Sequence, residues 1–380
     1  MAVFKRGKLW CYRVNFKNAG GAYVRKNGSG FRTKKEAQLA EGEVKQSLNK
    51  GFNLSAGDEL FTDFFQEWFD LYRKGKKSPE NDKDILTTIA FAKKHFTGVK
   101  LKDLDRKSYQ KALNEYGEDH ATATVKKRHT YLRACLREAI QEGIIFKDPT
   151  FNAQAIGKIP EKKESEKFLS QKEIHLLLNA LMVGIKTEYI SRHIILIQLA
   201  TGTRISEAMG LTWDCVDLDN HTLKINKTWD YKHTKNFDNT KNYASNRTIT
   251  IDQNTIHLLE NLKKAQEKAL EKSAFKNKKN LVFISLKDFE MITPDAVNKT
   301  LKNFCTKVGI KESITSHGLR HTHASLLLYK GINIKYISRR LGHKKIITTL
   351  QTYSHIIDEL EQKESRQVDD IMNDVYANIV

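Results

Sequence analysis

Two polar segments constrain the fold most, because they divide this chain of 380 residues into three parts. Residues 51–58 have the pattern of a linker, and residues 158–167 are polar and charged, as linkers between domains are. Between them, residues 60–149 follow a helical pattern that ends at an Asp-Pro pair. The pattern predicts three domains, at residues 1–57 with the linker included, 58–160 and 165–380.

The first 50 residues have the pattern of a small sheet followed by a helix. Residues 10–16 alternate as a strand does, and a second strand is predicted at residues 22–25 after a Gly-rich turn. An Asn27-Gly28 pair predicts another turn, towards a third strand. A capping box then predicts a helix over residues 33–49.

This N-terminal module is strongly basic. Residues 1–57 carry twelve Lys or Arg and three acidic residues, a net charge of +9. A basic three-stranded sheet can enter a DNA major groove, whereas charged edge strands can also simply be solvated. The density of charge favours DNA, with Arg13, Arg25 and Lys26 as predicted contacts.

The middle part is predicted to be all helical, with later helices near residues 84–96, 106–116 and 122–142. The last of these carries Lys126, Lys127 and Arg128, which are predicted to follow a phosphate backbone. The first helix carries an aromatic stripe, which at helical spacing predicts core packing rather than a platform for bases. Its members are Phe61, Phe64, Phe65, Trp68, Phe69 and Tyr72.

The composition agrees with a polyanionic partner. The formal net charge is +20 and the pI about 9.5, although a merely lysine-rich protein would share these values. The four cysteines are far apart, which predicts neither a zinc site nor a disulfide framework. No signal peptide or transmembrane run is evident, so we expect a soluble protein of the bacterial cytoplasm or nucleoid.

In the third part, a capping box at Ser170 and Glu173 predicts a helix, and Thr203 is predicted to cap another. Further helices are predicted at residues 193–200, at residues 256–272 and from Pro294. Strands are predicted at residues 223–229, 247–251 and 281–284. The whole is a multidomain, mainly α chain with small β parts, the last domain being mixed α/β.

The chemistry gathers near the C-terminal end. His317, Arg320 and His321 have i, i+3, i+4 spacing, so they share one face of a helix, and His343 and Tyr353 follow. A tyrosine that attacks a phosphate needs arginines to bind the phosphate oxygens, imidazoles, and an acid for the leaving oxygen.

Four motifs occur in the order and spacing of one family. They are Arg204 within TGTRISE, then HGLRH at residues 317–321, LGH at residues 341–343, and Tyr353 within TYSH. The chain resembles the tyrosine recombinases, and most closely the integrases of temperate phages and conjugative transposons. The resemblance implies a catalytic domain after residue 165, a SAM-like core-site-binding domain before it, and an arm-site-binding domain at the N-terminus.

The resemblance also implies roles. Tyr353 would be the nucleophile that forms a 3′-phosphotyrosyl bond, and Arg204 and Arg320 would clamp the phosphate. His317 would assist proton transfer, and His343 would hydrogen-bond the phosphate. Glu207 would support the site, although a solvent-facing glutamate is an equal reading of the residue.

A lysine in a β-hairpin would be the general acid. Lys241 has the expected spacing before Arg247, with Lys232 and Lys235 as alternatives. His321 would at most support the site, and His323, His355, Tyr329 and Tyr336 would be structural or flanking residues.

The resemblance implies strand exchange through a Holliday junction by a homotetramer on double-stranded DNA, to integrate and excise a mobile element. It implies no metal and no ATP. An excisionase and a host DNA-bending protein are expected partners. The C-terminal segment would dock on a neighbouring protomer or on its own domain. The alternatives are a chromosome-dimer resolvase of the same family and a catalytically silent DNA-binding regulator.

Overall fold

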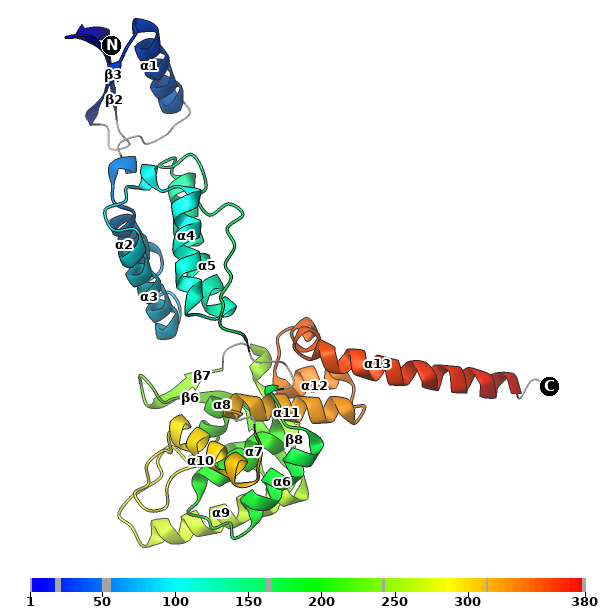
Figure 1. Ribbon diagram of the computed structural model, residues 1–380. Helices are drawn as coiled ribbons and strands as arrows, with labels where there is room; N and C mark the ends of the chain where they lie inside the picture. Colours follow the sequence, from blue (N-terminus) through cyan, green and yellow to red (C-terminus); the bar gives the residue numbers. More distant parts are fainter. Residues whose placement is uncertain are drawn as a thin grey trace. The chain divides into compact units, whose positions relative to one another are not determined.

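The chain divides into two compact units, Met1–Glu161 and Lys162–Val380, here called the N-terminal and C-terminal units (Figure 1). The structure is a computed structural model. It describes residues 2–17, 22–49, 56–161, 166–240, 243–311 and 314–377.

The N-terminal unit begins with an antiparallel sheet of three strands in the order β1-β2-β3, with a helix packed on one face. A sheet of three strands was predicted, but its first strand was missed. The predicted turn at residues 18–21 lies outside the described residues. The elements are β1 (Ala2–Arg6), β2 (Leu9–Lys17), β3 (Tyr23–Phe31) and α1 (Lys34–Asn49).

The turn predicted at Asn27-Gly28 is wrong, because both residues lie inside β3. Gly28 pairs with Tyr12 of β2 across the sheet. A Cβ atom on Gly28 would lie 2.1 Å from Cε1 of Tyr12, so the tyrosine ring covers the backbone at this point. The glycine therefore permits a close approach of a ring rather than a reversal of the chain.

A bundle of four helices follows, as the helical pattern predicts. Its hydrophobic core contains the predicted aromatic stripe except Tyr72, which is 40% exposed at the end of the first helix. The second helix begins earlier than predicted, because Ser78 caps it and a proline occupies its first turn. The helices are α2 (Phe61–Tyr72), α3 (Pro79–His95), α4 (Arg106–Glu118) and α5 (Thr122–Gln141).

The C-terminal unit is built around one buried helix, α7 (Ile190–Thr201), which contacts five other helices (Figure 1). Its residues from 193 to 199 are all buried. The other helices are α6 (Gln171–Met182), α8 (Ile205–Met209), α9 (Gln253–Glu271), α10 (Pro294–Lys307), α11 (Ser316–Tyr329), α12 (Ile334–Leu341) and α13 (Ile346–Ala377).

Short strands complete this unit in two small sheets. One has the order β4-β5-β8, and the other is the hairpin β6-β7. The predicted strand at residues 223–229 is two strands, because the chain changes partners from β8 to β7 near Asn226. The strands are β4 (Val216–Asp217), β5 (Thr222–Ile225), β6 (Lys227–Asp230), β7 (Asn236–Asn239) and β8 (Arg247–Thr250).

Two other predictions for this unit differ from the structure. Residues 281–284 form only isolated bridges, because the side chain of Gln266 takes the carbonyls of Leu281 and Val282. The capping box at Ser170 and Glu173 is confirmed. Thr203, however, does not cap α8. This helix begins at Ile205, so Arg204 occupies its N-cap position.

The last helix, α13, is interrupted at Tyr353, where φ is −117° and ψ is 19°. Ile356 is buried with Tyr353 against α11 and α12, whereas Val368 and Ile371 are exposed. Within the described part of the chain, none of the helices has the length and apolar character that a membrane span requires.

Replacement of Gly28 by alanine is expected to destabilise the N-terminal sheet by about 1–3 kcal/mol, because Tyr12 must leave its position. Hydrogen exchange of the β2 and β3 amides in the full chain measures this. The matched control is Gly42→Ala in α1, where the added Cβ meets nothing within 4 Å and about 0.5–1 kcal/mol of stabilisation is expected. Unchanged exchange in Gly28→Ala would show that the ring is not held over this glycine.

Candidate active site

Arg320 of α11 is the buried centre of the candidate site, with only 3% of its surface exposed. One terminal nitrogen donates to the carbonyl of Gly202, at 2.8 Å, and the other to the carbonyl of Leu341, at 2.6 Å. These carbonyls lie at the C-terminal ends of α7 and α12, where the helix dipole favours a cation. Burial lowers the pKa of Arg320 to about 9, so the guanidinium remains charged at neutral pH.

Both helices can end at this point because a glycine in the left-handed region follows each of them. The φ angle is 69° at Gly202 and 72° at Gly342. The geometry turns the last carbonyls towards Arg320. Three segments that are distant in sequence thus meet at one guanidinium.

Glu207 of α8 organises two further arginines. Its carboxylate accepts from Arg204 Nη1 at 2.6 Å and from Arg247 Nη2 at 2.9 Å, and the backbone N–H of Arg204 donates to it at 3.0 Å. Burial opposes ionisation of Glu207, but the two arginines outweigh it and hold the pKa of the carboxyl below its ordinary value. The carboxylate therefore supports the site and does not face solvent, since it is 2% exposed.

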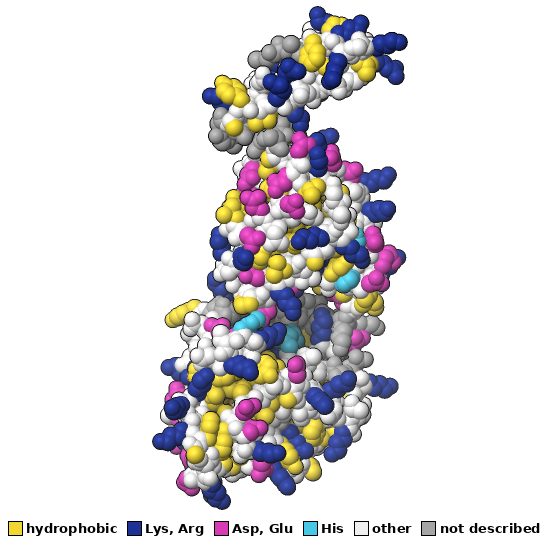
Figure 2. Space-filling model, turned by 90° about the vertical axis from the view of Figure 1, so that its left-hand side faces the viewer, with side chains coloured by type: hydrophobic (Ala, Val, Ile, Leu, Met, Phe, Trp, Pro, Cys, Tyr) yellow, Lys and Arg dark blue, Asp and Glu magenta, His cyan; other side chains and the backbone are white. Residues whose placement is uncertain are grey.

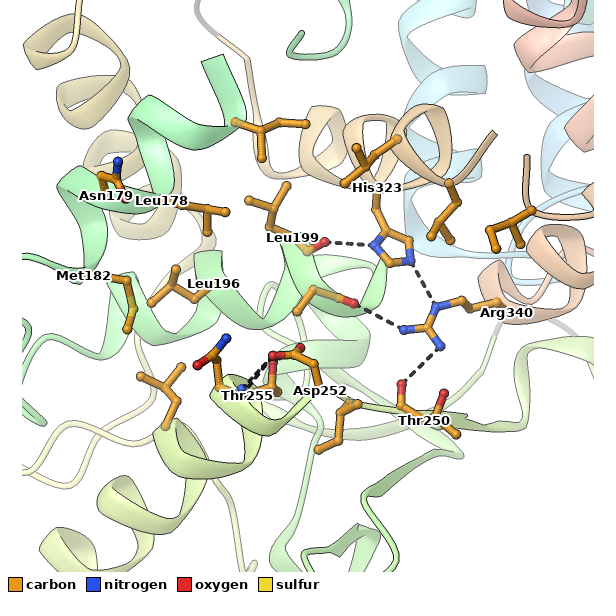
Figure 3. A pocket seen from close by; sticks show the side chains of 18 of the residues that line it. Leu178, Asn179, Met182, Leu196, Leu199, Thr250, Asp252, Thr255, His323 and Arg340 are labelled. Atoms are coloured by element: carbon orange, nitrogen blue, oxygen red, sulfur yellow. Dashed lines mark hydrogen bonds between the residues drawn. The ribbon is translucent and has the colours of Figure 1, made fainter. Parts of the chain in front are cut away.

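Arg340 of α12, whose role the sequence did not predict, braces this network. Its carbonyl accepts from Arg247 Nε at 2.6 Å. Its guanidinium donates to His323 Nε2 at 3.0 Å, and to the carbonyls of Thr250 and Ala200 (Figure 3). His323 is buried and its other ring nitrogen contacts the carbonyl of Leu199, so the predicted structural role fits.

Arg340 and His323, here called the brace, form one side of a largely apolar cavity of about 800 Å³ between α6, α7, α9 and α11. Burial lowers the pKa of His323 to about 3, which keeps the ring neutral and able to accept from Arg340. The sequence did not predict the roles of Arg247 and Arg340, because they depend on bonds that include contacts between residues 90 to 140 positions apart.

The predicted nucleophile, Tyr353, lies beside the histidines of α11. Its hydroxyl is 3.1 Å from Nδ1 of His321. The ring of His317 stands edge-on to that of His321, with the centroids 4.7 Å apart. His343 is held separately, through a contact of 2.8 Å between Nδ1 and the hydroxyl of Thr349.

The titrating groups share one electrostatic environment. Burial, together with Arg320 and Arg204, lowers the pKa of His317, and the same causes lower the pKa of His343 to about 4. Burial raises the pKa of Tyr353 to about 12, although Arg320 opposes the rise. At neutral pH the site therefore holds cationic arginines, neutral imidazoles on His317 and His343, and a protonated phenol, a set suited to bind and attack an anion.

Lys241 is the lysine predicted to lie in the hairpin. Lys241 lies outside the described residues. The hydroxyl of Thr240 and the side chain of Asn246, on either side of it, are 2.8 Å apart. The alternatives Lys232 and Lys235 lie in the turn that joins β6 to β7.

The predicted DNA contacts of the sheet divide between its two faces. Arg13 and Arg25 are exposed on the face away from α1, together with Asn15 and Asn27, and Lys and Arg side chains stand out on this module in Figure 2. Lys26 lies one residue further along β3, so it shares the helix-facing side with Val14.

The predicted contacts on α5 also differ from one another. Lys126 is exposed, and Lys127 is 3.0 Å from the carboxylate of Asp84. Arg128 is 6% exposed and donates to the carbonyl of Asp84 and the hydroxyl of Thr88, so its assignment as a phosphate contact is wrong. Its position on α5 directs its side chain into the interior of the helical bundle.

Metal ligands would have to come from grouped His, Cys, Asp or Glu side chains. Among the residues that the structure describes, no three of these are placed to hold a metal ion.

Replacement of Glu207 by glutamine is expected to lower the free energy of unfolding by about 3 kcal/mol at neutral pH, because the buried side chain of Arg247 and the partly exposed side chain of Arg204 lose their counter-ion. The pKa of Glu207 is depressed in the folded state, so its contribution is complete above the ordinary value of 4.5 and is lost as pH falls through the folded value. The difference between the two proteins should therefore narrow below that pH in urea titrations.

The matched control is Glu173→Gln in α6. Glu173 also occupies the third position of its helix and accepts from the residue before that helix, but it is only partly buried and has no arginine partner in the capping box. We expect a loss of at most about 1 kcal/mol. Equal losses in the two variants would contradict a special role for the Glu207 network.

Comparison with known proteins places this site in a family. Residues 167–359 match the phage integrase family, and residues 2–48 match an arm DNA-binding domain. The chain is 26% identical to a tyrosine recombinase XerC-like protein of Caldanaerobacter subterraneus, covering 98% of both chains. It is also 26% identical to an integrase of Staphylococcus phage L54a, covering 86% of this chain and 99% of that one.

Solved structures agree at the level of the fold. A Tn1549 transposon integrase in complex with transposon right end DNA has a TM-score of 0.67 at 19% identity, covering 81% of this chain and 99% of that one. A lambda integrase tetramer bound to a Holliday junction has a TM-score of 0.57 at 17% identity, with 90% and 95% covered. The family match spans just over half of the sequence. The chain therefore belongs to the phage integrase family and is a tyrosine-type site-specific recombinase.

Proposed function

We propose that this recombinase integrates and excises a mobile element, by cutting and rejoining DNA through a 3′-phosphotyrosyl bond to Tyr353 and a Holliday junction. The observation that carries this proposal is the placing of the Tyr353 phenol beside the cluster of Arg320, Arg204 and the histidines. The relatives named as a phage integrase and as the ICEBs1 integrase of Bacillus subtilis support an element of this kind.

The geometry suggests how the phosphate is held. Arg320 uses two of its N–H groups on helix ends, which fixes its plane and leaves further donors for a phosphate oxygen. Arg204 is held by Glu207 with its side chain 26% exposed, so it can supply the second cation of the clamp. His343 is proposed to donate to the phosphate, and His317 to assist proton transfer.

The cations matter most in the transition state. Attack by the phenol places a fifth oxygen on phosphorus, and arginines already fixed in position stabilise the added charge without reorganisation. The departing 5′ oxygen needs a proton, and Lys241 is the proposed donor. A bound phosphodiester would also raise the pKa of His317 and His343, because its negative charge offsets the nearby arginines.

The N-terminal module favours an integrase over a chromosome-dimer resolvase. Residues 2–48 match an arm DNA-binding domain, and the open face of its sheet carries arginine and asparagine side chains suited to base edges. We propose that this module binds arm sites and that the helical bundle binds core sites. A catalytically silent regulator would not need the Tyr353 and arginine arrangement.

The outer part of α13 suggests a contact between protomers on DNA. Ile356 packs in its own domain, but Val368, Ile371 and Val375 are 49–60% exposed. Apolar side chains in such a row normally become covered. We propose that this part of the helix docks on a neighbouring protomer of a tetramer, and that an excisionase and a DNA-bending protein set the direction of the reaction.

The assignment of the nucleophile is tested with a nicked, labelled duplex that carries the attachment site. The native protein should form a covalent adduct that persists in detergent, and Tyr353→Phe should form none while still binding the DNA. Tyr336→Phe, in which a partly exposed tyrosine of α12 is changed, is the control and should form the adduct normally. An adduct with Tyr353→Phe would overturn the assignment.

The arm-binding role is tested by changing Arg13 and Arg25 together to alanine. Binding to arm-type sites in DNA from the ends of the element should weaken about 10- to 100-fold, because two contacts of about 1 kcal/mol or more are lost. Footprints at core sites should stay the same. The control is Lys26→Ala, from the other face of the same strand, for which we expect little change. Equal effects of the two changes would contradict sheet-face recognition.

A further inference from the structure

Tyr353 needs a group to take its proton, and the structure shows which group is placed to do so. The phenol is 2% exposed and its pKa is about 12, so the hydroxyl stays protonated at neutral pH and has little contact with bulk water. Among the described residues, a base lies within hydrogen-bond distance, since Nδ1 of His321 is 3.1 Å from the hydroxyl oxygen. The two rings are inclined by 61° with centroids 5.7 Å apart.

Two helices fix this contact. His321 lies on α11 directly after Arg320, whose guanidinium is anchored to α7 and α12. Tyr353 lies at the interruption of α13, and its ring packs in an apolar cluster with Leu328 and Ile337. The hydrogen bond therefore joins two side chains whose backbones are held independently of it.

His317 is placed differently. It lies one turn before His321 on α11, and its ring meets the edge of His321 rather than the tyrosine hydroxyl. Imidazole is the side chain that exchanges a proton most readily near neutral pH. Of the two histidines, His321 has the geometry of a proton acceptor for the phenol.

We propose that His321 is the general base that deprotonates Tyr353, and the acid that returns the proton when the strand is rejoined. In cleavage, the phenolic proton passes to Nδ1, in the tautomer that carries hydrogen on Nε2. The phenolate oxygen forms a bond to phosphorus, the bond from phosphorus to the 5′ oxygen breaks, and the general acid donates a proton to that oxygen, which leaves as a hydroxyl group. The proposal rests on the proposed function.

The charges around His321 can accommodate this transfer. The titratable groups near His321 include His317 on α11, His343 after α12 and Tyr353 on α13. The imidazolium that forms lies next to the bound phosphodiester in this proposal. The negative charge of the phosphodiester compensates the positive charge of the imidazolium, while Arg320 binds the non-bridging oxygens.

The test compares His321→Asn with the native protein on a nicked duplex whose scissile phosphate has a 5′-bridging sulfur. A thiolate leaves without a proton, so the rate on this substrate reports deprotonation of the nucleophile and not the work of the leaving-group acid. Asparagine can accept a hydrogen bond near the position of Nδ1 but cannot take a proton.

We expect adduct formation by His321→Asn to be about 100-fold slower at neutral pH, with DNA binding within twofold of the native protein. The native rate should level off as pH rises, once the imidazole has lost its proton. The rate of His321→Asn should instead continue to rise with pH, as the phenol ionises by itself. The comparison variant is His317→Asn, which should be slower than the native protein because His317 belongs to the proposed site, but whose rate should still level off with rising pH as the native rate does.

Three results would overturn the proposal. His321→Asn could react at the native rate, it could be slower with the native pH profile, or His317→Asn could be the variant that loses the plateau. The first two would make the hydrogen bond a positioning contact, and the third would make His317 the acceptor. If the native protein itself formed no adduct, the proposed function would fail, which is a separate outcome.

Discussion

The candidate site depends on the burial of one cation, Arg320, between the C-terminal ends of α7 and α12. A guanidinium removed from water is costly unless its donors are used, and two helix-end carbonyls use them here. The glycines that end these helices direct the carbonyls inward. Any change that moves α7 against α12 therefore moves Arg320, which is why the brace around Arg340 matters although it lies behind the site.

Glu207 offsets the mutual repulsion of the arginines in the site. Arg204, Arg247 and Arg320 are close enough to perturb the same groups, and without a buried carboxylate their repulsion would favour an open site. The carboxylate holds Arg204 and Arg247, and Arg247 in turn donates to the carbonyl of Arg340. A chain of hydrogen bonds thus runs from the brace to the arginine proposed to clamp the phosphate, and it holds positive charge in place before any DNA is bound.

The position of each basic side chain in the fold also decides whether it can contact DNA. Arg13 and Arg25 stand on the open face of the sheet, whereas Lys26 falls on the other face because successive strand residues alternate. Arg128 is charged like its neighbours on α5, yet it serves the packing of α3. Charge in a sequence predicts a polyanionic partner, but the face on which each charge lies decides which residues can touch it.

The sequence by itself determined the helical parts, the capping box at Ser170, and the order of the motifs that contain Arg204, Arg320 and Tyr353, since these depend on spacing within a few residues. It did not reveal that Asn27-Gly28 continues a strand, because the covering ring belongs to β2. The roles of Arg247 and Arg340 and the contact of His321 with Tyr353 were decided by the tertiary structure alone. They rest on hydrogen bonds between residues 17 to 140 positions apart, which no local periodicity records.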